Sequence, residues 1–309
     1  MQKGPEYYFF RLLARILGEP GAAAFVRRCC VQFLAIPSLH RVVEPNFRRV
    51  WAYGRGREAT TEETTLFFSE MAALLAEERL AALELQRDPA HCPVPADAEL
   101  LPDIEALRRA GRGVLLVTPH FGDVKMLILG LAGCGVPLHV MVSYAGPSGR
   151  ALEAVRPNLR FADFGSGAQY YLDVLARNEV VLLYTDMDFF PGGRTADFFG
   201  APCHPPHGPA RLALATGAPI LPAYTVFERG RHHLRCDAPI LPEGLSQEEI
   251  EGRILRSIET FISRHPAHWQ MFHDPWDLKA RALAARNQMR YIRFNLMMDD
   301  WWRRLGFRP

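Results

Sequence analysis

The sequence contains a histidine and an aspartate spaced closely enough to share one loop and to do acid–base chemistry. His120 and Asp123 lie in the stretch Thr-Pro-His-Phe-Gly-Asp. A neutral imidazole can take up a proton near pH 7, and a carboxylate bonded to its other nitrogen fixes the tautomer and stabilises the imidazolium. The spacing therefore indicates His120 as a general base with Asp123 as its partner. The alternative is a loop histidine followed by an aspartate that caps the next helix.

The residues around this pair predict a strand, a loop and a helix. Residues 114–118 are apolar or β-branched without alternation, which is typical of a strand buried on both faces of a parallel sheet. Pro119 cannot donate to a ladder and should end the strand. Gly122 is a turn residue, and the apolar run 124–131 follows as a helix. His120 is thus expected beyond the carboxyl end of a strand, where open α/β sheets bind ligands.

The rest of the chain alternates between extended and helical segments. Further strands are predicted at residues 138–142, 180–184 and 219–226, with 233–236 as an additional candidate. Further helices are predicted at residues 104–109, 168–177, 209–216 and 247–264. Strands that alternate with helices form βαβ units. The predicted fold class is therefore α/β, with a mostly parallel central sheet flanked by helices.

Helical segments at both ends divide the chain into three predicted parts. These are an N-terminal helical leader at 1–95, an α/β core at 96–276 and a C-terminal amphipathic helical tail at 277–309. Within the leader, residues 61–86 have the apolar stripe of an ordinary packing helix. The start of the leader and the tail, where Trp301 and Trp302 stand beside arginines, allow two interpretations. Either they pack on the protein itself, or they lie in a membrane interface with arginines reaching the headgroups.

Composition argues against several classes of protein. The chain has 309 residues, 49% of them hydrophobic, which is enough for a sizeable core in one or two domains. A net charge of +2 gives no reason to expect a nucleic-acid partner. The six cysteines lack Cys-x-x-Cys spacing, so a reduced, cytosol-facing protein is expected rather than a disulfide scaffold or zinc site. No segment approaches the roughly 20 apolar residues of a spanning helix, and charged residues interrupt the N-terminal apolar run, so no secretory signal is expected.

Five motifs occur in an order and at spacings that resemble one known family. They are Thr118-Pro-His-Phe-Gly-Asp, Thr185-Asp-Met-Asp, Asp197-Phe-Phe-Gly-Ala-Pro, Gly208-Pro-Ala-Arg-Leu-Ala-Leu-Ala-Thr-Gly-Ala-Pro-Ile-Leu-Pro and Pro266-Ala-His-Trp-Gln-Met-Phe-His. Together they resemble the bacterial lipid A biosynthesis lauroyl/myristoyl acyltransferase family, within the lysophospholipid acyltransferase superfamily. The resemblance covers about residues 100–276.

The resemblance implies a parallel α/β core that transfers a fatty acyl group from an acyl carrier protein or coenzyme A thioester to a hydroxyl. It implies His120 as the general base on the acceptor, no covalent acyl-enzyme, no metal, and no cofactor besides the phosphopantetheine that carries the acyl thioester. It also implies a membrane-associated leader. The expected location is therefore peripheral, at the cytoplasmic face of the bacterial inner membrane, or else cytoplasmic.

The chain departs from the family's pattern in two places. The family has an acidic residue five positions after the histidine, but this chain has Lys125 there. Because an ammonium cannot accept a proton from imidazole, Asp123 is expected to take over as the partner of His120. The family also usually has an arginine after the second strand, whereas the next arginine here is Arg150. Loss of a bidentate anion clamp predicts an acceptor other than the usual phosphorylated glycolipid.

Further residues are candidates for binding the substrates. Asp186 and Asp188 follow the strand 180–184 and either hold the acceptor or a nearby arginine, or cap a turn. Arg194 either holds an anionic donor or acceptor, or is solvated. Phe198 either packs beneath the site or lines the acyl channel.

The remaining candidates lie at helix starts. His207 takes a position where the family usually has a small hydroxyl residue, and is either a substrate contact or a surface histidine. Lys125 is expected among the substrate contacts. The backbone N–H groups around Phe121 and Gly122 are expected to stabilise the oxyanion of the reaction.

These observations predict an acyltransferase that acts on a hydroxyl or amine of a lipid-like or specialised acceptor. The expected partners are an acyl carrier protein or acyl-coenzyme A, a lipid or small-molecule acceptor, and the membrane surface. Two alternatives stay open. One is a catalytically silent homologue that binds lipid or carrier protein, for which Lys125 and the missing arginine speak. The other is a thioester hydrolase, in which water replaces the acceptor.

Overall fold

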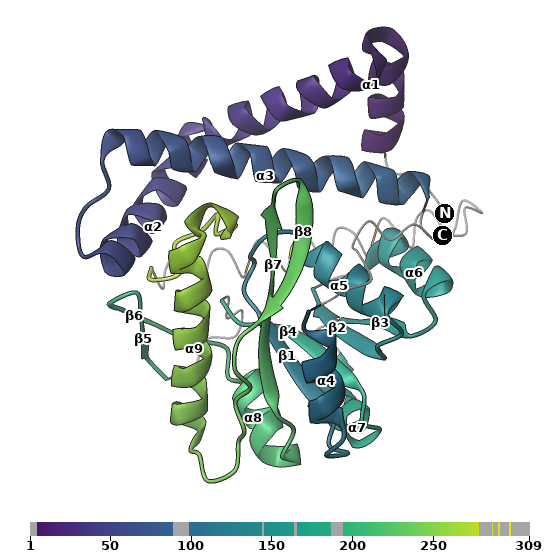
Figure 1. The fold of residues 1–309 in the computed structure, drawn as a ribbon, viewed down its shortest axis with the longest axis vertical. Coiled ribbons are helices and arrows are strands. Elements are labelled where there is room, and N and C mark those ends of the chain that lie inside the picture. Colours follow the sequence, from purple (N-terminus) through teal and green to yellow (C-terminus); the bar gives the residue numbers. More distant parts are fainter. Residues whose placement is uncertain are drawn as a thin grey trace.

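The computed structural model describes residues 5–88, 99–143, 145–163, 166–186 and 194–277, together with Arg286, Arg290 and Met297. They form a six-stranded central sheet with helices on both faces, and long N-terminal helices lie across one end of its strands (Figure 1). The strand order is β3-β2-β4-β1-β7-β8, and neighbouring strands are parallel except for β7 and β8. The predicted fold class is therefore confirmed.

The elements follow one another as the α/β prediction requires. The strands of the sheet are β1 (Val114–Thr118), β2 (Leu138–Val142), β3 (Leu159–Asp163), β4 (Val180–Tyr184), β7 (Ile220–Glu228) and β8 (Arg231–Cys236). The core helices are α4 (Leu101–Arg108), α5 (Val124–Gly133), α6 (Gly146–Val155), α7 (Gly167–Ala176), α8 (Gly208–Thr216) and α9 (Gln247–Arg264), followed by the 3-10 turn Pro266–His268. A separate antiparallel pair consists of β5 (Ala196–Phe198) and β6 (Ala201–Cys203).

Strand β1 runs through the middle of the protein and is buried on both faces. Leu115 and Val117 contribute to the hydrophobic cluster formed with α7, α8 and α9, whereas Val114 and Leu116 contribute to the cluster formed with α4 and α5. Side chains of a strand alternate between the two faces of a sheet. A strand with a core on each side therefore needs apolar residues at every position, which explains the unbroken run in the sequence.

The register of β1 brings two distant loops together. β1 pairs in parallel with β4 on one side and with β7 on the other. Thr118, the last residue of β1, lies opposite Tyr184, the last residue of β4. His120 and Asp186 each come two residues after this pair, so both leave the sheet at the same edge.

The structure contains elements that were not predicted from the sequence. β1, β2 and β4 coincide with the predicted strands, and β7 and β8 overlap the segments predicted at 219–226 and 233–236. β3 was not predicted, because this edge strand reads Leu-Arg-Phe-Ala-Asp with Arg160 exposed. α6 was not predicted either, because a short segment with two glycines and a proline has a weak helical pattern.

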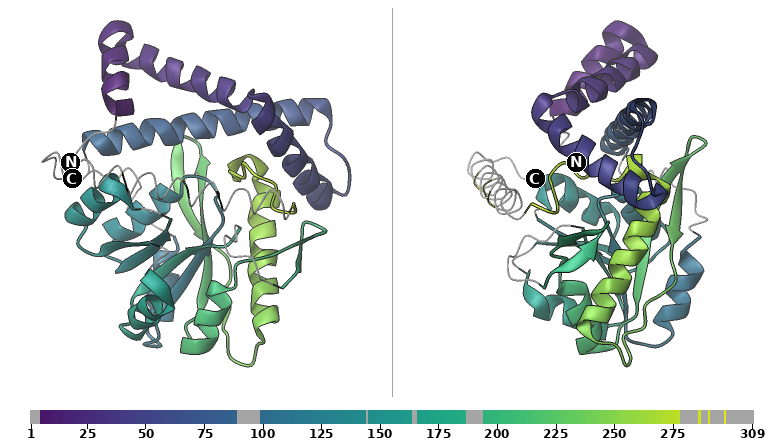
Figure 2. Two further views of the ribbon diagram at one scale, coloured as in Figure 1. Left: turned by 180° about the vertical axis from the view of Figure 1, so that it is seen from behind. Right: turned by 90° about the vertical axis from the view of Figure 1, so that its left-hand side faces the viewer.

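The leader folds into three helices, α1 (Pro5–Leu34), α2 (Pro37–Arg55) and α3 (Thr61–Arg87). α1 bends at Gly18, whose φ is +73°, two residues before Pro20, and its second arm runs along α3 (Figure 2). Among the described residues, no single helix is long and apolar enough to cross a membrane, and α1 and α2 meet that criterion only as a pair bent by 79°. The predicted tail with Trp301 and Trp302 lies outside the described residues, apart from Asp277 and three single positions.

Substitution of a residue in β1 tests this two-sided core. Leu116→Ala removes a fully buried side chain from the middle of the sheet, so the free energy of unfolding should fall by about 2–5 kcal/mol. Leu66→Ala is a matched control, since Leu66 is 66% exposed on α3, and should change stability by less than about 0.5 kcal/mol. Chemical denaturation checks both variants, and equal losses of stability would contradict the assignment of β1 to the core.

Candidate active site

The imidazole of His120 is held by the carboxylate of Asp186. Nδ1 of His120 lies 2.8 Å from Oδ1 of Asp186, and the backbone N–H of His120 donates to Oδ2 over 2.7 Å. A carboxylate can only accept, so Nδ1 carries the hydrogen and Nε2 is left with its lone pair. The Asp186 side chain is fully buried, whereas 37% of the His120 side chain is exposed. The pair therefore has the arrangement of a general base and the group that orients it.

The segment after α9 fixes this pair from the other side. Nε1 of Trp269 donates to Oδ2 of Asp186 over 3.0 Å. The backbone N–H of Gly122 donates to the carbonyl of His268 over 2.7 Å, and the N–H of Gln270 donates to the carbonyl of His120 over 2.8 Å. The His120 loop and residues 268–270 thus pair like two short antiparallel strands. Trp269 belongs to the last of the five sequence motifs, which begins at Pro266. Its contact with Asp186 gives that motif a physical role.

The electrostatics of the pair suit proton transfer. Burial by itself would lower the pKa of His120, but the charge and the hydrogen bond of Asp186 outweigh it and raise the pKa above its ordinary value. Burial would likewise raise the pKa of Asp186, but His120 and the donors from its backbone and Trp269 lower it. Tyr184 stacks on the imidazole with ring centres 4.4 Å apart. Burial and the nearby carboxylates raise the pKa of Tyr184, so it stays a neutral phenol.

The expectation that Asp123 orients His120 is corrected by this geometry. Asp123 caps α5, because its Oδ1 accepts the backbone N–H of Lys125 over 3.0 Å. The helix begins directly after Asp123, so the side chain folds back onto its own backbone instead of reaching the imidazole. The carboxylate that contacts His120 is instead that of Asp186, two residues beyond the end of the neighbouring strand β4. Asp186 was expected to touch the acceptor or an arginine, and its contact with His120 was not foreseen.

Lys125 connects the start of α5 to α3. Its ammonium pairs with Glu78 of α3 and lies 3.3 Å from Oδ1 of Asp123. The other oxygen of Glu78 accepts Nε2 of Gln270 over 2.6 Å. Burial would raise the pKa of Glu78, but Lys125, Gln270 and Arg79 lower it, so Glu78 stays charged. The substrate contact expected of Lys125 stays a prediction, and the structure gives it a bracing role beside the loop.

The expected oxyanion donors are already engaged. The backbone N–H of Phe121 donates to the carbonyl of Pro119 over 2.8 Å, and that of Gly122 donates to His268. The Phe121 side chain is completely buried and stacks on His268. Phe121 and Gly122 therefore shape the loop through these contacts, and their role as oxyanion donors and substrate contacts stays a prediction.

The other expected substrate contacts are dispersed. Arg194 pairs with Glu248 in the first turn of α9, at the end opposite the one that leads to residues 266–268. Phe198 is buried against Trp269, which agrees with packing beneath the site. The remaining two are His207, which lies 3.1 Å from Glu251 through Nδ1, and Asp188, which lies outside the described residues.

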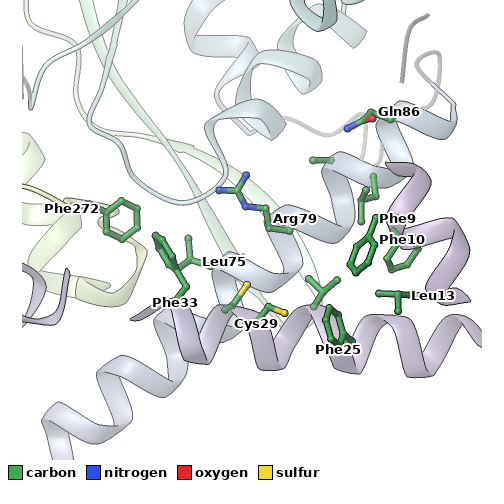
Figure 3. A pocket seen from close by; sticks show the side chains of 14 residues that line it. Phe9, Phe10, Leu13, Phe25, Cys29, Phe33, Leu75, Arg79, Gln86 and Phe272 are labelled. Carbon is green, nitrogen blue, oxygen red and sulfur yellow. The ribbon is translucent and has the colours of Figure 1, made fainter. Parts of the chain in front are cut away.

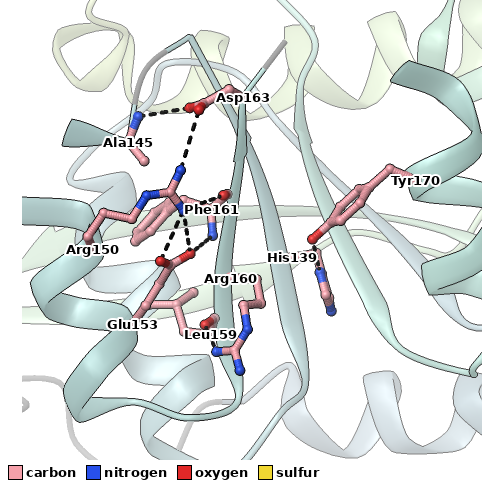
Figure 4. A network of polar contacts seen from close by, with 9 residues as sticks. All are labelled: His139, Ala145, Arg150, Glu153, Leu159, Arg160, Phe161, Asp163 and Tyr170. Atoms are coloured by element: carbon pink, nitrogen blue, oxygen red, sulfur yellow. Dashed lines mark hydrogen bonds and ion pairs between the residues drawn. The ribbon is translucent and has the colours of Figure 1, made fainter. Parts of the chain in front are cut away.

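Arg150 reaches the carboxyl edge of β3, but carboxylates engage it there. Its guanidinium donates to Glu153 over 3.1 Å and to Asp163 over 3.4 Å (Figure 4). Asp163 also accepts the backbone N–H of Ala145 over 3.0 Å. Both carboxylates therefore engage the guanidinium of Arg150. Among the described residues, no group of three or more metal-ligating side chains could hold a metal ion.

Gly122 is a position where the loop tolerates no side chain. Its φ is +60°, and a Cβ would lie 2.1 Å from the carbonyl oxygen of Thr225. Gly122→Ala should therefore displace the loop or lower the free energy of unfolding by more than about 2 kcal/mol. Gly208→Ala is the matched control, because nothing lies within 4 Å of a Cβ there. Thermal melting of both variants checks this, and equal melting temperatures would contradict the geometry.

Removal of the charge at Asp186 should lower the pKa of His120. The carboxylate raises that pKa, so Asp186→Asn leaves burial as the dominant effect and shifts the imidazole titration to lower pH. Asp163→Asn, at the end of β3, has no contact with His120 and should leave the titration unchanged. NMR titration of the His120 ring measures both, and an unchanged curve in Asp186→Asn would remove Asp186 from its role.

Comparison with known proteins identifies the family of this chain. The profile of the family described as bacterial lipid A biosynthesis acyltransferase matches residues 95–277, which is more than half of the chain. A phosphatidylinositol mannoside acyltransferase of Mycolicibacterium smegmatis is 27% identical over 175 residues, covering 54% of this chain and 58% of that protein. The protein of the same name from Mycobacterium tuberculosis H37Rv is 28% identical over 198 residues, covering 57% of this chain and 58% of its own length.

The chain thus spans somewhat more than half the length of these relatives. The matched region contains the loop after β1 with His120, the loop after β4 with Asp186 and the segment with Trp269. The pair of His120 and Asp186 is called the dyad below. On the extent of this match, the chain belongs to the bacterial lipid A biosynthesis acyltransferase family.

Proposed function

We propose that this protein transfers a fatty acyl group from a thioester to a hydroxyl of a lipid-like acceptor, with His120 as the general base. The observation that carries the proposal is the dyad itself. Nδ1 of His120 is committed to a buried carboxylate, which leaves Nε2 basic, on a side chain that is partly open to solvent. The names of the family and of its mannoside-acylating relatives support acyl transfer to a lipid-type acceptor.

The proposed reaction uses one proton shuttle. Nε2 of His120 takes the proton of the acceptor hydroxyl as its oxygen attacks the thioester carbonyl, and Asp186 stabilises the imidazolium that forms. When the tetrahedral intermediate collapses, the carbon–sulfur bond breaks and the leaving thiolate takes the proton from Nε2. The enzyme returns to its starting state without a covalent intermediate. No cofactor takes part in these steps besides the phosphopantetheine that bears the acyl group.

The substrates follow from the same reasoning. For the donor we propose an acyl carrier protein or acyl-coenzyme A, as the family resemblance implies. For the acceptor, the relatives suggest a sugar hydroxyl on a lipid. The engagement of Arg150 by two carboxylates supports an acceptor other than a phosphorylated lipid A precursor. We further propose a peripheral position at the cytoplasmic face of the membrane, which the exposed apolar residues of α1 support.

Intact-mass analysis of acylated carrier protein tests the reaction. The wild-type protein, incubated with this donor and a bacterial lipid extract, should remove the acyl group and produce a lipid heavier by one acyl chain. His120→Ala should lower the rate by about 10²–10⁴-fold, because general base catalysis is lost. Asp186→Asn should also lower it, whereas Asp163→Asn should not.

The pattern of results separates the alternatives. Loss of the acyl group without lipid extract would indicate hydrolysis, and carrier binding without any loss would indicate a silent homologue. The pH profile adds a check on the base. Because the pKa of His120 is raised, the rate should fall with decreasing pH through a value above about 6.5, and this limb should move to lower pH in Asp186→Asn.

A further inference from the structure

A large apolar groove lies between α1 and α3. It has a volume of about 570 Å³, which is in the range of about 300–1,000 Å³ typical of small-molecule sites. Its lining is mainly aromatic and aliphatic, with Phe9, Phe10, Phe25 and Phe33 from α1 and Phe272 from the segment after α9 (Figure 3). The leader therefore does not close tightly over its own helices, and a space that suits a hydrocarbon chain stays open.

The cation at this groove is Arg79, which acts on the charge of Glu78 from a distance but makes no hydrogen bond or ion pair among the described residues. Arg79 is the charged residue among those that line it, and its side chain is exposed. Among the described residues, no carboxylate or carbonyl accepts a hydrogen bond from its guanidinium, whereas Arg27 pairs with Glu77 and Arg11 with Glu19. An unpaired guanidinium beside an apolar space matches an amphiphile that has an anionic head and a hydrocarbon tail.

The groove is separate from the place where the reaction would occur. Leu75, Arg79 and Leu83 share the face of α3 that lines it, at helical spacing. Glu78 lies on the neighbouring face, where it pairs with Lys125 and Gln270 beside the His120 loop. The body of α3 thus lies between the groove and His120. The groove and the His120 loop thus lie on different faces of α3.

The surroundings of the groove indicate where such an amphiphile comes from. Nine of the 15 exposed large apolar side chains among the described residues lie between Tyr8 and Ile36. α1 contains four arginines, Arg11, Arg15, Arg27 and Arg28, and two glutamates, which gives a formal charge of 4 − 2 = +2. An exposed apolar and basic helix is typical of a segment that lies on an anionic bilayer. The groove therefore opens beside a surface suited to the bilayer.

We propose that the groove between α1 and α3 takes up one acyl chain of an anionic membrane phospholipid, and that Arg79 binds the headgroup of that lipid. The lipid is a structural ligand that holds the leader on the membrane, and it is neither donor nor acceptor. The chain packs against the phenylalanines, and the headgroup stays at the mouth of the groove, where the guanidinium is accessible.

Photolabelling from vesicles tests this directly. Two probes are used, phosphatidylcholine and phosphatidylglycerol, each with a diazirine near the end of one acyl chain. A trace of the first is added to phosphatidylcholine vesicles, and a trace of the second to vesicles that also contain phosphatidylglycerol. After photolysis, the label per vesicle-bound protein is located by peptide mass spectrometry. We expect labels on the α1 and α3 peptides that line the groove. Ala82→Phe fills the groove and should abolish them, whereas Ala73→Phe, on an exposed position of α3 outside the groove, should not.

The headgroup contact has its own variant pair. Arg79→Gln should reduce labelling by the phosphatidylglycerol probe about tenfold, since a hydrogen bond to a charged group is lost. Arg28→Gln removes an exposed arginine outside the groove and should not reduce labelling per bound protein. If the phosphatidylcholine and phosphatidylglycerol probes label the wild-type protein equally, and Arg79→Gln is labelled to the same extent as the wild type, the role of Arg79 would be overturned.

Other outcomes decide what occupies the groove. Labels spread over exposed residues of α1 and unaffected by Ala82→Phe would overturn the groove as a lipid site. An acyl-coenzyme A carrying the same diazirine that labels these peptides and competes with the phospholipid would also overturn it, because the groove would then belong to the donor. His120→Ala should label like the wild type, so failure of the proposed acyl transfer and failure of lipid binding can be told apart.

Discussion

The buried carboxylate of Asp186 is the constraint on which the rest of the site depends. It accepts the imidazole and the backbone N–H of His120 and the indole of Trp269. A charged group at this depth would cost several kcal/mol if its hydrogen bonds were not satisfied. The three donors offset this cost and lower the pKa of the carboxyl. In return, the carboxylate fixes the tautomer of His120 and leaves Nε2 with its lone pair, on a side chain that is partly exposed.

Three elements have to be in place for this arrangement, and none of them is local to His120. β4 brings the carboxylate alongside β1, the segment after α9 brings Trp269 and pairs with the loop, and α3 contributes Glu78 to the bracing contacts of Lys125 and Gln270. Gly122 makes the close approach to β7 possible, since its missing Cβ leaves room for the carbonyl of Thr225. The site thus lies at the carboxyl ends of β1 and β4. The leader also stabilises it, through the contacts of Glu78 in α3 with Lys125 and Gln270.

Much of this could be predicted from the sequence, for reasons that the structure makes clear. The unbroken apolar run of β1 reflects burial on both faces, and the proline after it marks the edge where His120 lies. The partner of His120 could not be predicted, because a parallel sheet joins strands by register and not by proximity in the chain. Asp123 is three residues from His120 but caps its own helix, whereas Asp186 is 66 residues away and one strand across. The motif Asp186-Met-Asp predicted acidic side chains after the strand 180–184, but it did not predict which group Asp186 contacts.

The spacing of the dyad also bears on how the protein comes to be active. Contacts between residues far apart in sequence form late, since loop-closure entropy opposes them until a nucleus exists. The contact of His120 with Asp186 depends on the pairing of β1 with β4, and that of Trp269 depends on the docking of the chain beyond α9. A nascent or partly unfolded chain accordingly holds an ordinary histidine rather than an oriented base. The oriented state of His120 therefore depends on the tertiary structure as a whole and on no single segment of the chain.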